Sequence, residues 1–414
     1  MFKRLKNYKT IASNTFYLSI INVVRLLSPF IALPYIIRVI GSEHFGEIAF
    51  AQSIAAFAVI AVNFGLEISA IKDVSQNRND KKELSRIVSS VLGVKALLFV
   101  FTAVAYAIII FSVPIFRENS LLFFIAFCIS IPEVVFPVWY FQGIEKMKLL
   151  TITNFFSIIF YLSTLFIFVR EIEDYLFVPI LQIGGLILSS LIGLYILIIH
   201  ERIELHIPLK KDMAKTFWEA LPFFSSRVSV VVNQNIAKIV SGLFLGMTEV
   251  AAFELAQKII TAALIPFKMF NQAVYPHNAN VQDKHFAKQC LRLTTLGAAA
   301  AAVLIYLLAP FIISLLAGED EIVGLSIITL RFLIGFHFFG SLGMYVGSPI
   351  LIAWGYSKPF NVSVFLSTIA LLLIYAVLYL MNKLQLETFA LSMMGVEMII
   401  FGYRYYYCKK YAIL

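Results

Sequence analysis

The stretch Leu33–Ile54, LPYIIRVIGSEHFGEIAFAQSI, decides the fold, because it places a short polar elbow between two apolar runs. A similar stretch, LGMTEVAAFELAQKI, begins at Leu245. An offset of 205 positions pairs Gly41 with Gly246, Ala51 with Ala256, Gln52 with Gln257 and Ile54 with Ile259. This offset is close to half of the 414 residues, so we expect two related domains, 1–208 and 209–414.

The composition indicates a membrane protein. The chain is 60% hydrophobic and 14% charged, with a mean hydropathy of +0.88, whereas soluble domains are about 45–50% apolar and about 25% charged. Its apolar blocks are about 20 residues or longer, which is the helix length that crosses roughly 30 Å of hydrocarbon. The short alternating segments of an outer-membrane barrel are missing from the sequence. We therefore predict an all-α polytopic membrane protein.

Twelve apolar blocks are expected to be transmembrane helices. Their approximate ranges are 15–37, 46–71, 87–112, 121–142, 150–169, 176–199, 217–245, 251–275, 289–316, 322–354, 360–381 and 388–407.

The distribution of basic residues predicts the orientation. Of the 33 Lys and Arg residues, 22 are assigned to the N-terminal segment, the alternate loops that share its side and the C-terminal segment, and four fall in the other loops. The 22 include Arg292 and Arg404, which lie at the ends of two predicted spans and are counted with the adjoining loop and terminus. Positive loops lie on the cytoplasmic side, so both termini are predicted to be cytoplasmic. Six spans per half make a direct repeat, which predicts two pseudo-symmetric six-helix lobes related by an axis along the membrane normal. The net charge of +9 follows from this topology and does not indicate nucleic-acid binding.

Two further features concern local geometry and bound groups. Gly41 and Gly246 are expected to adopt the left-handed conformation that ends a helix. The three cysteines have no CxxC spacing and the histidines have no metal-ligand spacing, so we expect neither a disulfide nor a metal site. No phosphate-binding loop occurs, and no cofactor is expected.

Seven basic residues remain after this count, and all seven lie inside the predicted spans. Each would cost about 2.5–3.5 kcal/mol at the centre of a lipid-facing helix. They are Arg25, Lys95, Arg227, Lys238, Lys258, Lys268 and Arg331. Lys95 and Lys268 lie about two turns from the cytoplasmic end and are expected to extend towards the interface. Lys258 has Glu254 one turn away, which predicts an ion pair within the helix.

The other cations are candidate substrate-binding residues. Arg25 and Arg331 fall near mid-span, and Asn22 shares a face with Arg25. Arg227, Gln234 and Lys238 follow one another at i, i+7 and i+11 and form one polar stripe of a helix. Such residues favour a water-filled cavity that takes an anionic ligand.

Acidic residues and one histidine are candidates for ion coupling. They are Glu67, Glu133, His337 and Glu397. Structural pairing with the cations is the alternative for the three acids. For His337 the alternative is a hydrogen-bonded packing role, because a histidine can titrate near neutrality but is also found in cores.

The opening stretch resembles the N-terminal signature of polysaccharide exporters in the multidrug/oligosaccharidyl-lipid/polysaccharide superfamily. The matching residues are Pro34-Tyr35, Arg38-Val39-Ile40-Gly41 and Phe45-Gly46. Twelve spans in two halves with cytoplasmic termini also match that family, and Wzx-type O-antigen flippases are similar. The resemblance implies a non-enzymatic flippase in the bacterial inner membrane. Its cargo would be undecaprenyl-diphosphate-linked oligosaccharide, which alternating access would move from the cytoplasmic to the periplasmic leaflet. The implied partners are membrane lipid and the polymerase and chain-length regulator of the same pathway.

Two alternatives are weighed against this interpretation. An O-antigen polymerase-type glycosyltransferase should need a larger outer loop with convergent polar groups, and every predicted outer loop has about eight residues or fewer. A drug exporter of the same superfamily should place acidic residues in its cavity, whereas the predicted spans contain no Asp and the candidates are basic.

Overall fold

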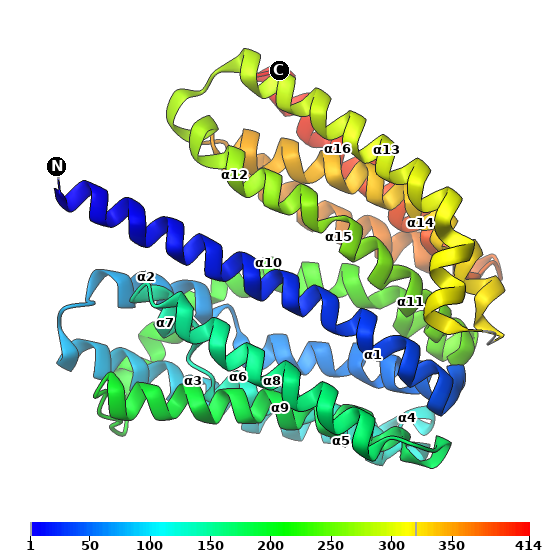
Figure 1. Ribbon diagram of the computed structural model, residues 1–414, viewed down its shortest axis with the longest axis horizontal. Helices are drawn as coiled ribbons and strands as arrows, with labels where there is room; N and C mark the ends of the chain where they lie inside the picture. Colours follow the sequence, from blue (N-terminus) through cyan, green and yellow to red (C-terminus); the bar gives the residue numbers. More distant parts are fainter. Residues whose placement is uncertain (1, 319–320) are drawn as a thin grey trace. The chain divides into compact units, whose positions relative to one another are not determined.

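In the computed structural model every secondary-structure element of the described part of the chain is a helix (Figure 1). The backbone is described for residues 2–318 and 321–414, and the side chains for residues 28–318 and 321–414. The elements up to residue 200 are α1 (Phe2–Asn63), α2 (Leu66–Gln76), α3 (Lys81–Ser112), α4 (Pro114–Glu118), α5 (Ser120–Phe127), α6 (Ser130–Val135), α7 (Val138–Gly143), α8 (Met147–Phe168), η1 (Ile172–Leu176), α9 (Phe177–Tyr195) and η2 (Ile196–His200). They are followed by α10 (Lys210–Phe244), α11 (Met247–Ala263), α12 (Ile265–Val281), α13 (Lys284–Ala317), α14 (Ile322–Tyr345), η3 (Val346–Ile352), α15 (Ser357–Leu380) and α16 (Leu386–Lys410).

Ten segments of the described chain are long and apolar enough to cross a membrane. The first, Ser28–Gln76, contains the break at Gly41 and covers most of the first two predicted spans. The seventh predicted span, 217–245, lies in α10, which is not among the ten because its sequence carries several polar and charged residues. These segments show that the chain is a multi-pass membrane protein.

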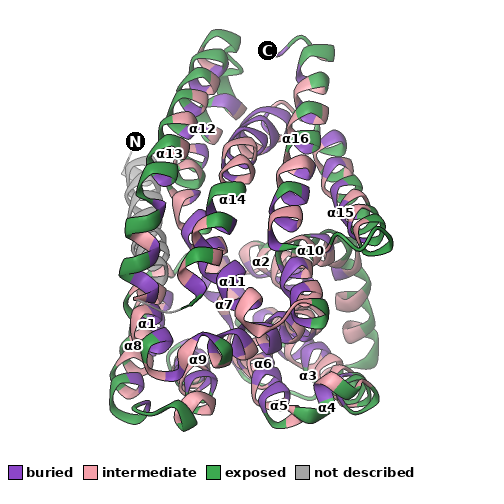
Figure 2. Ribbon diagram, turned by 90° about the vertical axis from the view of Figure 1, so that its right-hand side faces the viewer, coloured by how far each residue is buried: buried purple, intermediate pink, exposed green. Residues whose placement is uncertain are grey.

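Exposed apolar side chains support this conclusion. Figure 2 shows exposed residues along much of α13. They include Leu293, Leu296, Val303, Leu304, Leu307, Phe311 and Leu315. A soluble protein rarely leaves so large an apolar face in water, whereas lipid covers such a face without cost.

Two of the apolar blocks are interrupted at prolines. The block 120–143 is divided into α5, α6 and α7, and Pro137 follows the end of α6. The block 247–281 is divided between α11 and α12, with Pro266 in the first turn of α12. Proline has no amide hydrogen and cannot complete the helical ladder, so carbonyl oxygens near it become available to side chains.

The chain forms two compact units. Unit 1 comprises residues 1–40 and 51–231, and unit 2 comprises residues 41–50 and 232–414. Both α1 and α10 therefore contribute residues to each unit.

Unit 1 has its buried core between α2, α3, α7 and the first half of α10. This core contains the fully buried side chains of Trp139, Tyr140 and Phe141 of α7, which pack with Leu84 and Val88 of α3. In addition, α8 packs along α9, and α6 contacts both α3 and α9.

Unit 2 is organised around α14. This helix packs against α11, α13 and α16, and α15 packs against α16. One core cluster joins Tyr345, Ile350 and Leu351 at the α14–η3 junction to Cys290 and Cys408. Asn278 donates a hydrogen bond to the carbonyl oxygen of Pro349 in η3 at 3.0 Å.

The two elbow glycines break the helices, but not in the predicted conformation. Gly41 has φ 79° and ψ 169°, so its φ favours glycine while its ψ is extended. Gly246, with φ 159° and ψ 175°, is close to fully extended. The prediction of a left-handed conformation is therefore wrong at Gly246, whereas Gly41 has the predicted positive φ but an extended ψ.

Candidate functional site

The most concentrated group of buried charges in the described part of unit 2 joins α10 to α11. The ammonium group of Lys238 lies 2.8 Å from Oε2 of Glu254, and that of Lys258 lies 2.8 Å from Oε1. The side chains of Lys238 and Glu254 are only 11% and 9% exposed, whereas that of Lys258 is 34% exposed. We call these three residues the charge cluster.

The helix hairpin explains why these residues meet. Lys238 lies eight residues before Gly246, and Glu254 lies eight residues after it. With a rise of about 1.5 Å per residue, both stand roughly 12 Å from the elbow on antiparallel helices. Lys258 follows Glu254 by one turn, so its ammonium group reaches the second oxygen of the same carboxylate.

The charge cluster has a net charge of +1, because two ammonium groups share one carboxylate. Its least buried member is a cation, and the nearby stripe is polar. Gln257 donates a hydrogen bond to the carbonyl oxygen of Gln234 at 2.9 Å, and the side chain of Gln234 is exposed. The arrangement can attract an anion through Lys258 while Glu254 holds Lys238 in place.

The predicted binding residues Arg331 and Arg227 are both exposed. Arg331 of α14 places its guanidinium carbon 4.8 Å from the ring centre of Tyr306 on α13, a cation–π contact. Within unit 2, Arg331 and Lys238 thus have different partners. Arg227 belongs to the unit 1 part of α10. Arg25 and Asn22 lie outside the residues whose side chains are described.

In unit 1 the predicted coupling residue Glu133 takes part in a polar group around the end of α6. Its Oε2 accepts a hydrogen bond from Asn63 at 3.0 Å, and its carbonyl oxygen accepts one from Lys95 at 2.8 Å. Lys95 is fully buried, so the expectation that it extends to the interface is wrong. The break of the helix before Pro137 leaves a carbonyl oxygen that the buried ammonium group can bind.

The remaining coupling candidates lie in different surroundings. Glu67 is half-buried in the first turn of α2. His337 is fully buried in α14, where its Nε2 lies 3.3 Å from the carbonyl oxygen of Ala263 and its ring packs edge-on against Phe267. These contacts fit the alternative given above for His337, a hydrogen-bonded packing role.

Glu397 and Arg404 share a face of α16, and Arg404 is a buried cation that the sequence count assigns to the C-terminal segment. Its Nε donates to Oγ of Ser363 on α15, and its Nη1 donates to the carbonyl oxygen of Gly343 on α14, both at 2.8 Å. The guanidinium also lies 4.3 Å from the ring centre of Phe360. Its position among tyrosines, in the run YRYYY, is an interfacial pattern, so the sequence offers little sign of this burial.

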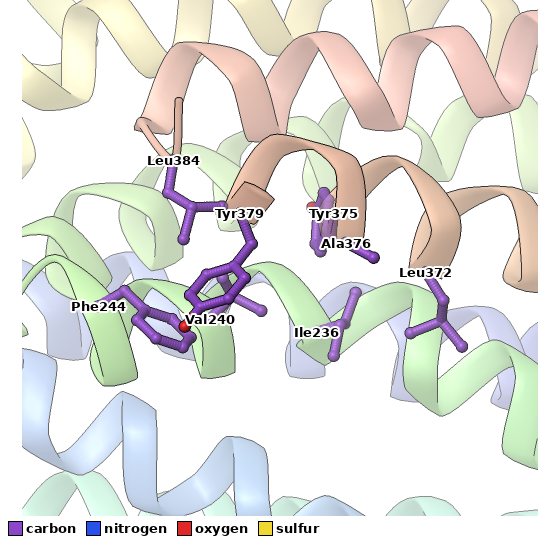
Figure 3. A pocket seen from close by; sticks show the side chains of 8 residues that line it. All are labelled: Ile236, Val240, Phe244, Leu372, Tyr375, Ala376, Tyr379 and Leu384. Carbon is purple, nitrogen blue, oxygen red and sulfur yellow. The ribbon is translucent and has the colours of Figure 1, made fainter. Parts of the chain in front are cut away.

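An apolar groove runs along the other side of α10 within unit 2 (Figure 3). Its volume is about 230 Å³. The lining residues are Ile236, Val240 and Phe244 of α10, Leu372, Tyr375, Ala376 and Tyr379 of α15, and Leu384. At 100° per residue, the α10 residues of the groove lie on the side of the helix away from Gln234 and Lys238.

Comparison with known proteins agrees with this architecture. A protein from Escherichia coli (strain K12) named "Putative O-antigen transporter" is 23% identical to this chain over an alignment of 411 residues. The match covers 95% of this chain and 95% of that protein.

Two solved structures share the fold. A multidrug resistance MATE family transporter of the MOP superfamily, in an inward-facing conformation, has a TM-score of 0.73 at 15% identity and covers 95% of this chain and 98% of its own. The lipid II flippase MurJ, in an inward closed conformation, has a TM-score of 0.68 at 14% identity, with coverage of 95% and 87%. The chain therefore shares its fold with these two solved structures.

The family model described as "Polysaccharide biosynthesis protein" matches residues 11–282, which is more than half of the chain. The chain therefore belongs to the polysaccharide biosynthesis protein family.

Proposed function

We propose that this protein is a flippase for undecaprenyl-diphosphate-linked O-antigen or related polysaccharide repeat units. It would move them from the cytoplasmic to the periplasmic leaflet of the bacterial inner membrane. The observation that carries the proposal is the net positive charge cluster inside a helix hairpin. The Escherichia coli relative of the chain is named "Putative O-antigen transporter". Neither the diphosphate nor the sugars of this cargo can cross hydrocarbon unaided. An intramembrane cation offsets the charge of the diphosphate.

In the proposed mechanism, twelve spans form two six-helix lobes, 1–208 and 209–414, with both termini in the cytoplasm. The lobes open alternately to the two sides of the membrane. The residues that would contact the diphosphate or acidic sugars are Arg25, Arg227, Lys238 and Arg331, with Asn22 and Gln234. Coupling to an ion would use Glu67, Glu133, His337 or Glu397.

Both faces of α10 suit an amphiphilic cargo. The stripe that contains Gln234 and Lys238 is polar, whereas the groove lined by Ile236, Val240 and Phe244 is apolar. One helix can therefore offer hydrogen bonds and charge to a head group, and a hydrocarbon surface to part of a prenyl chain.

A drug exporter is the second candidate, because a multidrug transporter shares the fold. Cationic drugs need an acidic site, and the charge cluster has the opposite sign. This difference favours an anionic cargo.

The first experiment measures on which side of the membrane the lipid-linked repeat units lie in cells that lack the protein. Units trapped on the cytoplasmic leaflet, with no surface polymer, are the expected result. Single units that reach the periplasm without polymerisation would instead identify an enzyme that acts after translocation.

A charge series then tests the cluster. Lys238→Gln makes the cluster neutral and should lower export, and adding Glu254→Gln to that variant returns the net charge to +1 through Lys258. Recovery of export in the double variant would show that net charge matters, and Lys268→Gln, an exposed cation of α12, is the matched control. Unchanged export in Lys238→Gln at normal protein level would remove the charge cluster from the proposal.

A further inference from the structure

The segment between η2 and α10, residues 201–209, lies against α3 and is called here the strap. The backbone amide of Glu204 donates to Oγ of Ser85 at 3.1 Å, and that of His206 donates to Oγ of Ser89 at 3.0 Å. At the next turn, a Cβ added at Gly93 would lie 2.6 Å from Cγ of Pro208. The strap therefore follows one face of α3.

The spacing of these contacts shows that the strap is extended. Ser85, Ser89 and Gly93 are four residues apart, which is about 6 Å along a helix. Their partners are two residues apart, and two residues of extended chain span about 6.6 Å. Successive side chains of an extended chain point to opposite sides.

Ion pairs hold both ends of the strap. At the first end, the carboxylate of Glu201 forms ion pairs with the ammonium groups of Lys146 and Lys81, the latter at 3.4 Å. The ammonium group of Lys81 also donates a hydrogen bond to the carbonyl oxygen of Glu201 at 2.7 Å. Beyond the other end, Arg86 of α3 binds Asp212 of α10 in a bidentate pair at 2.8 and 2.5 Å. The path of the strap is thus fixed by charged and polar contacts within unit 1.

One face of the strap is apolar and uncovered. Ile203 is 1% exposed and belongs to the unit 1 core, but the next three residues of that face are not covered. Leu205 is 45% exposed, Ile207 is 96% exposed and Leu209 is 68% exposed. The intervening residues Glu204 and His206 are polar, so this extended segment is amphipathic.

Its surroundings identify what covers this face. The membrane-crossing segment Ile172–His200 ends one residue before the strap, so the strap begins at the membrane surface. Trp218, 65% exposed in the third turn of α10, is an aromatic residue of the kind that lies at lipid head groups.

The charge around the strap favours an anionic surface. Arg202, Lys210 and Lys211 are exposed and form no ion pair with a carboxylate in the described chain, whereas Glu201 and Asp212 are already paired with cations. Apolar side chains flanked by free basic residues are typical of segments that bind anionic lipid.

We propose that the apolar face of the strap, formed by Leu205, Ile207 and Leu209, inserts into the head-group region of the membrane surface beside it, with Arg202, Lys210 and Lys211 on anionic lipid phosphates. The strap is then an interfacial element that ties α3 and the start of α10 to the bilayer surface. This inference does not depend on what the protein transports.

Spin labels on the full-length protein test the proposal. Ile207→Cys and Leu205→Cys are labelled in a Cys128→Ala background, because Cys290 and Cys408 are buried. In vesicles that contain phosphatidylglycerol, the labels should collide readily with oxygen and rarely with a water-soluble nickel chelate. Glu204→Cys and His206→Cys, on the polar face, are the matched controls and should show the opposite preference.

Two results would overturn the proposal. Free access of the nickel chelate to a label at position 207 would mean that this face lies in water. An immobile label that neither reagent reaches would mean that a protein surface covers it. The basic residues are tested separately: Lys210→Gln with Lys211→Gln should raise nickel access at position 207 several-fold, as should vesicles of phosphatidylcholine alone. No change in either case would remove anionic lipid from the proposal.

Discussion

Gly46 of α1 lies directly against Met247 of α11, so that a Cβ added at Gly46 would be 1.8 Å from the Met247 carbonyl oxygen. The same two chain stretches meet again where a Cβ at Gly242 would be 2.4 Å from the ring of Phe50. The two elbows that resemble each other in sequence are therefore packed together within unit 2.

Gly46→Ala should lower stability markedly, because the atom it would approach belongs to the backbone and cannot rotate away. Overpacking typically costs about 1–3 kcal/mol, and a backbone clash should reach at least that range. The measurement is the apparent unfolding temperature in detergent. Gly395→Ala is the control, since a Cβ there meets nothing within 4 Å, and helix propensity alone should leave stability equal or higher. Equal unfolding temperatures for the two variants would contradict the close approach.

Substitutions in the charge cluster should differ in severity. Glu254→Gln leaves two ammonium groups without an anion and should be the most destabilising, by roughly 3–5 kcal/mol for a broken buried pair. Lys238→Met should cost less, because Glu254 keeps Lys258. Lys258→Met should cost least, because its side chain is partly exposed. Thermal unfolding of the three variants gives the order, and a larger effect of Lys258→Met than of Glu254→Gln would contradict it.

The anchor of the strap should make stability depend on pH in acid. Burial alone would raise the pKa of Glu201, but the ammonium groups of Lys146 and Lys81 outweigh it, and the pKa lies below its ordinary value of 4.5. Because the folded pKa is depressed, the stabilisation is complete above pH 4.5 and is lost as the pH falls through the folded pKa.

Unfolding temperatures between about pH 7 and about pH 3.5 test this dependence. The difference between wild type and Glu201→Gln should be largest at neutral pH and should shrink below about pH 4.5. Glu204→Gln is the control, because its side chain is 81% exposed and lacks these partners. A constant difference for Glu201→Gln across the range would show that the carboxylate charge is not what stabilises the strap.

Arg404→Lys should destabilise unit 2 although it keeps the charge. A lysine cannot donate to Ser363 and Gly343 together while stacking on Phe360. Each hydrogen bond to a charged group contributes about 1.5–3 kcal/mol, so a clear fall in unfolding temperature is expected. Lys409→Gln, at an exposed cation of the same helix, should have little effect. Similar values for both variants would mean that the buried contacts of Arg404 contribute little.

The membrane helices could be predicted because apolar length is a property of the sequence alone. The ion pair of Lys258 with Glu254 could also be predicted from the sequence, since residues four apart on a helix lie on one face. The contact between Lys238 and Glu254 was not predicted, although their equal distance from Gly246 indicates it once the elbow is accepted as a tight hairpin.

The buried polar contacts elsewhere could not be predicted from the sequence. Lys95 and Arg404 each bind a carbonyl oxygen on another helix, and which carbonyl is available depends on helix breaks and on tertiary packing. A count of charges along the chain places both residues near an interface, whereas the fold buries them.

Residues 41–50 belong to unit 2, although they are encoded in the first tenth or so of the chain, and residues 210–231 belong to unit 1. A gene cut between codons 208 and 209 would therefore yield two fragments that each lack a piece of their own compact unit. Neither fragment should fold when it is produced alone. The two fragments should fold only when they are made in the same cell, where each can supply the piece that the other lacks. The two compact units are therefore not separable at one point of the chain, which would keep either one from being exchanged on its own during evolution.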